Sequence, residues 1–212
     1  MMILPLNALT LASPAVNDIL SFWFDTSRHS ITELNQRWFH GGSALDRMIG
    51  DRFGPLIERA LAGGLRDWES DAYSLVALIV LLDQFPRNVF RGTARAYAGD
   101  PRARRLCRMG LEEGWFTALP WHYQAFALMP LEHSESLLDQ SQMVEALTRL
   151  LAHADAESAG HLGRFLRSAK EHRSIIRQFG RFPHRNVVLG RESTPAEAAF
   201  LIDGPRFGQG VR

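Results

Sequence analysis

Side chains that could bind an anion or transfer a proton concentrate in three short stretches of this sequence. The first, residues 82–88, reads Leu-Asp-Gln-Phe-Pro-Arg-Asn and is followed by Arg91. Asp83 comes at the end of an apolar run, so its carboxylate emerges from the expected core, where a buried charge needs a partner. Arg87 and Arg91 are the nearest candidates, with Asn88 beside them. A guanidinium is a planar donor fork suited to carboxylate or phosphate, so this stretch is a candidate anion site.

The second stretch, residues 129–135, reads Met-Pro-Leu-Glu-His-Ser-Glu. Pro130 is predicted to break one helix and start another, which would place Glu132, His133 and Glu135 in a first helical turn. Carboxylates are favoured there because the first backbone N–H groups are free. The two glutamates are three residues apart and would share one face of the helix.

The third stretch, residues 180–186, reads Gly-Arg-Phe-Pro-His-Arg-Asn and echoes the Phe-Pro-Arg-Asn of the first. It places Arg181, His184, Arg185 and Asn186 around a proline that is predicted to follow a helix end. The echo is too short to establish a duplication. Both stretches nevertheless present Arg and Asn side chains just beyond a helix, where they could meet a ligand.

His172 lies on the helix that precedes the third stretch. It falls on an apolar stripe with Phe165, Leu166, Ala169 and Ile176 at helical spacing. A histidine in this position is either a hydrogen-bonded core residue or part of a site that the stripe carries toward the other clusters.

These residues suggest two roles. His133 or His184 would act as acid or base, oriented by Glu132, Glu135 or Asp83. The ligand-binding candidates are the polar residues of the three stretches together with His172: Asp83, Arg87, Asn88, Arg91, His172, Arg181, Arg185 and Asn186. The alternative for Asp83, Arg87 and Arg91 is a structural ion-pair network that joins two helix ends.

Several other kinds of site are disfavoured. The histidines and glutamates show no His-x-x-x-His or Glu-x-x-His spacing, and the nearby arginines would repel a metal ion. No phosphate loop, dinucleotide fingerprint, nucleophile elbow or zinc motif is present, so we expect no metal and no cofactor. A basic stripe runs along residues 164–181, but aromatic residues do not interleave with it and the net charge is only +1, so we do not expect nucleic-acid binding.

The composition is that of an ordinary globular protein. The 212 residues are 46% hydrophobic and 22% charged, enough for one sizeable core. The single cysteine, Cys107, excludes an internal disulfide and suits a reducing compartment. No secretory signal or membrane span is evident, and the longest apolar run, residues 75–82, is too short to cross a bilayer. We therefore expect a cytoplasmic protein without membrane contact.

Helix signals recur along the whole chain, and no segment shows sustained period-two alternation. Ser13-Pro14, Asp100-Pro101 and Thr194-Pro195 each resemble a cap followed by proline at the first helical position. The expected helices cover residues 14–24, 31–39, 43–61, 70–82, 100–113, 120–129, 134–153 and 155–179, with a last short one after 194. We predict one all-α domain over residues 1–212, with a core of about 14–202 and irregular ends. Eight or nine antiparallel helices would form its stack.

Several motifs make the sequence resemble a known family. They are residues 17–24 (Asn-Asp-Ile-Leu-Ser-Phe-Trp-Phe), 37–39 (Arg-Trp-Phe), 82–88, 129–135 and 180–186, the last followed by Leu-Gly-Arg-Glu-Ser-Thr at 189–194. Over about residues 16–201 the chain resembles the bacterial family called domain of unknown function 924. The resemblance implies a TPR-like helical fold. It implies no established activity and assigns no catalytic residue.

Two functional hypotheses arise from the sequence. In the first, the polar clusters converge on one pocket that binds a small ligand with a carboxylate, acyl or phosphate group, as an enzyme or a binding protein. In the second, a TPR-like stack offers an open groove to an acidic peptide or partner protein, and the polar clusters are structural. The sequence is also compatible with a homo-oligomer. A pocket shared by at least two clusters would favour the first hypothesis.

Overall fold

The structure is a computed structural model that describes residues 13–209. Over this range the chain forms helices and turns without a β-strand, which confirms the predicted all-α class. The α-helices are α1 (Pro14–Phe24), α2 (Ile31–His40), α3 (Gly42–Leu61), α4 (Ala72–Ile79), α5 (Phe85–Val89), α6 (Asp100–Glu112), α7 (Trp121–Glu132), α8 (Leu137–Ala152), α9 (Ala156–Phe179) and α10 (Pro195–Asp203). The predicted irregular N-terminal end lies almost entirely outside the described residues.

Local capping signals act as expected at several helix ends. The Ser13 hydroxyl accepts a hydrogen bond from the backbone N–H of Val16 at the start of α1. Thr194 and Glu197 form a reciprocal capping box at the start of α10. The helix α9 ends at Gly180, whose φ of 70° is a left-handed conformation that glycine adopts without strain. These ends are determined by residues within one turn of each other, so sequence patterns predict them well.

The predicted cap at Asp100 is wrong, because Asp100 is the first residue of α6 and Gly99 occupies the N-cap position without a side-chain hydrogen bond. Two other local patterns that favour a cap also fail to form one. The helix α3 begins directly after Gly41 without a side-chain cap, so Ser43 and Asp46 form no capping box. Only Gly41 separates α2 from α3, and Asp46 is drawn instead into ion pairing with Arg91. The helix α4 is capped by Asp71, whose carboxylate accepts two backbone N–H groups, and not by the preceding serine.

The prolines of the first two stretches do not end helices. Pro130 lies inside α7, so Glu132 and His133 stand at the carboxyl end of that helix and not in the first turn of a new one. A proline there removes one helical hydrogen bond, and the burial of α7 on every side outweighs that loss. Pro86 likewise lies in the first turn of α5, which continues from α4 through a π-helical segment, Val80–Gln84.

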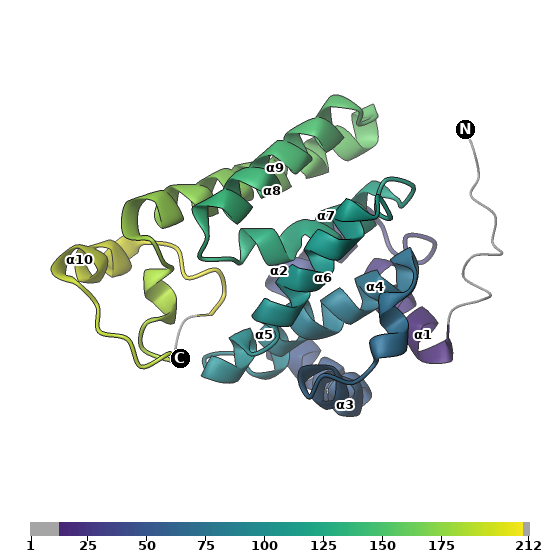
Figure 1. Cartoon of the computed structure of the whole chain (residues 1–212), viewed down its shortest axis with the longest axis horizontal. Coiled ribbons are helices and arrows are strands. Elements are labelled where there is room, and N and C mark those ends of the chain that lie inside the picture. Colours follow the sequence, from purple (N-terminus) through teal and green to yellow (C-terminus); the bar gives the residue numbers. More distant parts are fainter. Residues whose placement is uncertain (1–12, 210–212) are drawn as a thin grey trace.

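The helix α7 occupies the middle of the molecule. It packs against α4 and α6 on one side and against the antiparallel pair α8 and α9 on the other (Figure 1). This position explains why residues 125–132 of α7 and 75–85 of the α4–α5 region are buried throughout. The apolar run at residues 75–82 therefore belongs to a segment that is packed on all faces.

A second, smaller apolar cluster lies at the carboxyl end of α9. Ile175, Ile176 and Phe182 form it, and Phe179, Phe200 and Phe207 pack against it. Through this cluster the chain after α10 returns to the body of the protein (Figure 1). Among residues 13–209, no helix combines the length and apolar character needed to cross a membrane.

Candidate functional site

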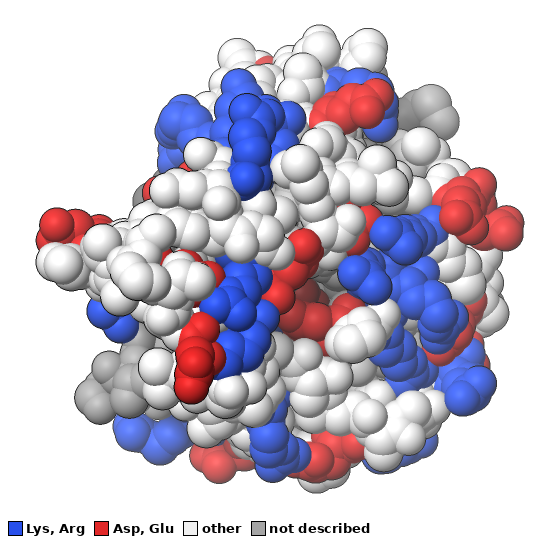
Figure 2. Space-filling view, turned by 60° about the vertical axis from the view of Figure 1, so that its left-hand side comes forward, with Lys and Arg blue, Asp and Glu red and all other residues white. Residues whose placement is uncertain are grey.

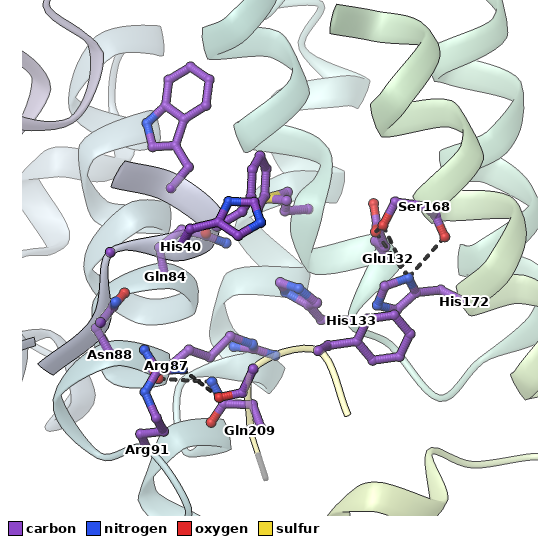
Figure 3. Close-up of a pocket in the computed structure, with 17 residues that line it drawn as sticks. His40, Gln84, Arg87, Asn88, Arg91, Glu132, His133, Ser168, His172 and Gln209 are labelled. Atoms are coloured by element: carbon purple, nitrogen blue, oxygen red, sulfur yellow. Dashed lines mark hydrogen bonds and ion pairs between the residues drawn. The ribbon is translucent and has the colours of Figure 1, made fainter. Parts of the chain in front are cut away.

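A cavity of about 540 Å³ lies where α2, α5, α7 and α9 meet the segment 204–209 (Figure 3). Its apolar wall comes from Trp38, Phe39, Met129 and Phe207. Its polar side chains are His40, Gln84, Arg87, Asn88, Arg91, Glu132, His133, Ser168, His172 and Gln209. The first and second polar stretches therefore meet in one cavity, together with His172 from the long helix α9.

The centre of this site is a contact between Asp83 and His133. The Nδ1 atom of His133 lies 2.7 Å from Oδ1 of Asp83, whose side chain is completely buried. Burial alone would raise the pKa of Asp83, but His133 and Arg87 hold it at about 2. The carboxylate is therefore ionised and can only accept, so Nδ1 of His133 carries the proton. Burial and the charge of Arg87 lower the pKa of His133, so its ring is neutral at neutral pH.

The π-helical segment explains how Asp83 reaches this position. A π-turn inserts an extra residue into a helix and rotates the next turn about the helix axis, and such turns are frequent at functional sites. Gln84, the next residue, donates to the other carboxylate oxygen of Asp83 and itself faces the cavity. Asp83 thus contacts His133, and the side chain of the neighbouring Gln84 lines the cavity.

A second polar group is formed by Glu132, Ser168 and His172. The Ser168 hydroxyl donates to Oε1 of Glu132 at 2.7 Å, and Nδ1 of His172 lies 3.1 Å from the same oxygen (Figure 3). That Nδ1 is also 2.9 Å from the backbone carbonyl of Ser168, which can only accept. Nδ1 of His172 is therefore protonated. Burial raises the pKa of Glu132 to about 7 and lowers that of His172 to about 3.

Both histidines consequently present an unprotonated Nε2. Within residues 13–209, the Nε2 atoms of His133 and His172 make no hydrogen bond. The two ring centres are 6.3 Å apart, and both rings line the cavity. The pair therefore offers two unprotonated ring nitrogens as hydrogen-bond acceptors, and one of the two rings is oriented by a buried aspartate.

The arginines of the first stretch are tied to carboxylates. Arg87 binds Asp100 through two nitrogens at 2.8 and 3.0 Å and reaches Asp83 at 3.3 Å. Its carboxylate neighbours raise the pKa of Arg87 despite its burial. Arg91 makes the equivalent paired contact with Asp46, at 2.9 and 3.0 Å. Any anion that enters the cavity meets guanidiniums whose charge is already balanced.

Comparison with known proteins bears on the family of this chain. The model of the family described as "Bacterial protein of unknown function (DUF924)" matches residues 19–205. The chain belongs to the DUF924 family. A solved structure, a protein of unknown function, ATU0120, from Agrobacterium tumefaciens, is 35% identical with a TM-score of 0.75. That similarity covers 89% of this chain and 97% of the other. Among curated proteins, none matches.

The DUF924 chain places the rest of the predicted site outside the cavity. Glu135 binds Arg191 at 2.7 and 3.0 Å and accepts from the backbone N–H of Phe182. Arg181 binds Glu197 at 2.6 and 2.8 Å. The first pair joins the loop before α10 to the turn after α7, and the second joins α10 to the chain just after α9. In this part of the chain the charged side chains are used in ion pairs between segments of the fold.

The remaining residues of the third stretch lie behind the cavity. Asn186 accepts from Arg191 and donates to Ser193, so it organises the loop. The guanidinium of Arg185 lies between the rings of Tyr97 and Phe182 and 3.5 Å from Asp100. His184 is largely buried beside Phe182 and Phe207, and that burial lowers its pKa to about 3. Neither His184 nor Arg185 lines the cavity.

Sequence reasoning missed the part of the site that lies after α10. The ring of Phe207 stacks on His172 with centres 3.8 Å apart. The Gly208 carbonyl accepts from Arg91, and the Gln209 side chain donates to the Arg87 carbonyl at 2.9 Å. No spacing or motif distinguishes these residues in the sequence. Trp38 and Phe39 also line the cavity, and the glycine pair that follows them at 41–42 is the available signal that the chain turns there.

Cys107 has no place in the site. Its thiol is buried on α6, and burial and the nearby carboxylates raise its pKa. A thiol in this environment stays protonated and unreactive. Within the described residues, no group of His, Cys, Asp and Glu side chains is arranged to hold a metal ion.

Proposed function

We propose that this DUF924 protein binds a small molecule with a carboxylate, acyl or phosphate group in the cavity and acts on it by proton transfer through His133. The observation that carries the proposal is the 2.7 Å contact between Asp83 and Nδ1 of His133, a residue that also lines the cavity. A fully buried carboxylate that orients a neutral imidazole is the arrangement that makes Nε2 a base.

Glu132 supplies the complementary acid. Its carboxyl lies next to His133 in sequence, faces the same cavity and has a pKa of about 7, so both protonation states are accessible near neutral pH. A base and an acid whose environments separate their pKa values are the usual means by which one site both removes and returns a proton. His133 would take the proton from the ligand, and Glu132 would donate to the atom that gains electron density.

The anionic group of the ligand would lie at the end of the cavity formed by Asn88 and Arg91, opposite Glu132 and His172 (Figure 3). Arg87 and Arg91 retain N–H donors that no described residue uses. The α3 helix also begins there without a side-chain cap, so its free backbone N–H groups favour negative charge. Because both guanidiniums are already paired, we expect modest affinity for simple anions.

The alternative, a groove for an acidic peptide, has less support. A peptide groove would present its polar residues at the surface, whereas Glu132 and His172 are 2% and 5% exposed. Basic and acidic side chains are interspersed over the face shown in Figure 2. A surface of mixed charge does not select an acidic partner, because selection of that kind needs a complementary positive patch. A partly open cavity with buried polar groups in its wall therefore favours a small molecule.

Ligand binding can be tested by recording the ¹⁵N resonances of the histidine rings during titration with acetate, succinate and inorganic phosphate. We expect the Nε2 resonance of His133 to shift, and that of the exposed His153 at the end of α8 to stay unchanged. If none of these anions perturbs the ring of His133 or His172, the anionic part of the proposal is wrong.

Turnover requires a second experiment. A bacterial metabolite extract is incubated with the wild-type protein or with His133→Asn and compared by mass spectrometry. We expect a compound that the wild type consumes and that His133→Asn consumes roughly a hundredfold to ten-thousandfold more slowly, the usual contribution of a general base. The matched control is His153→Asn, which should behave as wild type. Equal rates for all three proteins would exclude His133 as the base.

A further inference from the structure

The end of the cavity formed by α7 and α9 carries acceptors without donors. Among the described residues, Oε2 of Glu132 is buried and makes no hydrogen bond. A buried polar atom left unpaired costs free energy comparable to a lost hydrogen bond. Ser168 cannot supply the missing donor to Oε2, because its hydroxyl is already directed at the other oxygen of Glu132.

His133 and His172 also contribute acceptor atoms that lack a hydrogen-bond donor. Their Nδ1 protons are engaged by Asp83 and by the Ser168 carbonyl, so each ring presents a bare Nε2 to the cavity. Neither ring gains a proton near neutral pH, because burial lowers the pKa of both. A molecule that fills this end must therefore bring N–H or O–H groups of its own.

The charges around Glu132 favour a cation over a neutral donor. The groups that face its carboxyl are Asp83 from the π-helical segment, Ser168 and His172 from α9, and the exposed Glu171. None of them is positive at neutral pH, and Arg87 is neutralised by Asp83 and Asp100. The rings of Trp38, Phe39 and Phe207 on the cavity wall also tolerate a cation.

We propose that the ligand carries a primary ammonium group, which donates to Oε2 of the ionised Glu132 and to Nε2 of His172, so that Nε2 of His133 remains free to act as the base. This inference rests on the proposed function and specifies its substrate class. The ligand would be a small amino acid-like zwitterion with its ammonium between α7 and α9 and its anionic group near Asn88 and Arg91. An ammonium has donors in several directions and no acceptor, which matches a set of convergent acceptors.

The test compares compounds that differ only in the amine. Glycine, β-alanine and γ-aminobutyrate are titrated by calorimetry against acetate, propionate and butyrate, with ethylamine and propylamine as amines without an acid group. A hydrogen bond between buried charged groups contributes enough that we expect at least one amino acid to bind about tenfold more tightly than its parent acid. Glu132→Gln, which keeps the shape and removes the charge, should abolish that difference. Glu171→Gln, on the surface beside His172, should preserve it.

Each outcome decides between the two proposals. Equal affinity for amino acids and parent acids in the wild type overturns the ammonium site and leaves the anion site standing. Binding of the simple amines without the acids supports the ammonium site and overturns the anion site. A preference for amines that persists in Glu132→Gln overturns the assignment to Glu132. Failure of every compound overturns both proposals, and the wild-type comparison holds whether or not the variant folds.

Discussion

At the scale of single residues, the carboxyl group of Glu132 combines deep burial with a raised pKa. Its side chain is 2% exposed, and its pKa is raised to about 7 from an ordinary 4.5. A carboxyl group whose pKa is higher in the folded than in the unfolded chain favours folding while it is protonated. That contribution is complete below about pH 4.5 and is lost as the pH rises through about 7.

We therefore predict that Glu132→Gln changes the pH dependence of stability. Between about pH 5 and about pH 8 the wild type should lose roughly 3 kcal/mol of unfolding free energy relative to the variant, which has no proton to lose. Urea unfolding at several pH values measures the difference between the two curves. Parallel curves would show that Glu132 is not a buried, protonated acid, and Glu171→Gln provides the control for an exposed glutamate.

Asp83 presents the opposite case, because it is buried and charged. It is paired with Arg87 and His133, and its pKa is lowered to about 2, so it stabilises the fold above about pH 4 and ceases to do so in acid. Asp83→Asn leaves the guanidinium short of one partner. We predict a loss of about 3–5 kcal/mol, measured by urea unfolding at neutral pH. The exposed Asp67→Asn should change stability by less than about 0.5 kcal/mol, and a similar small effect for Asp83→Asn would contradict the ion-pair geometry.

At the scale of secondary-structure elements, the π-helical segment depends on how closely α6 approaches it. Gly99 caps α6, and a Cβ atom built there would overlap the backbone carbonyl oxygen of Leu82. The neighbouring atom is backbone, so it cannot rotate away as a side chain would. This close approach holds the segment that carries Asp83 against the helix that carries Asp100.

Gly99→Ala should therefore destabilise the protein by about 3 kcal/mol, at the upper end for overpacking, and should perturb the Asp83–His133 contact. The matched control is Gly160→Ala in α9, where a Cβ meets no atom within 4 Å. Removing a glycine from an open helical position should stabilise by about 0.5–1 kcal/mol. We expect the changes in unfolding free energy to have opposite signs for the two variants. A Gly99→Ala variant as stable as the wild type would disprove the close packing.

At the scale of the whole molecule, the segment after α10 closes the cavity without belonging to the main core. Phe207 packs on His172 and on the small apolar cluster of Phe182, whereas the large cluster consists of residues from α1 to α9. Phe207 is also one of two described non-glycine residues with a positive φ, 47°, so its backbone is strained. We therefore expect the main core to fold without this segment, and the cavity to be complete only with it.

A chain that ends at Pro205 should test this separation. We predict an unchanged far-UV circular dichroism spectrum, a loss of about 2 kcal/mol in unfolding free energy from the missing aromatic contact, and weaker binding of any compound that occupies the cavity. Loss of helical signal would mean that the segment is needed for the fold. Unchanged ligand affinity would mean that it does not complete the site.

The part of this protein that sequence alone determined is local in origin. Helix ends at Ser13, Thr194 and Gly180 depend on residues within one turn, and the apolar run at 75–82 indicates a segment buried on all sides. The predictions failed at Pro130 and at the π-helical segment, because packing around α7 and α5 overrides a local preference there. Tertiary contacts, not residue type, make those stretches helical.

The tertiary structure alone decided which polar residues meet. Arg87 and Arg185 follow the same Phe-Pro pattern, yet one lines the cavity and the other lies behind it between two rings. Their neighbours in the chain are alike, but their positions depend on the angles at which α5, α7 and α9 cross. Phe207 and Gln209 joined the site only because the chain folds back after α10. Residue type and spacing predict what a side chain can do, whereas the packing of distant helices decides what it faces.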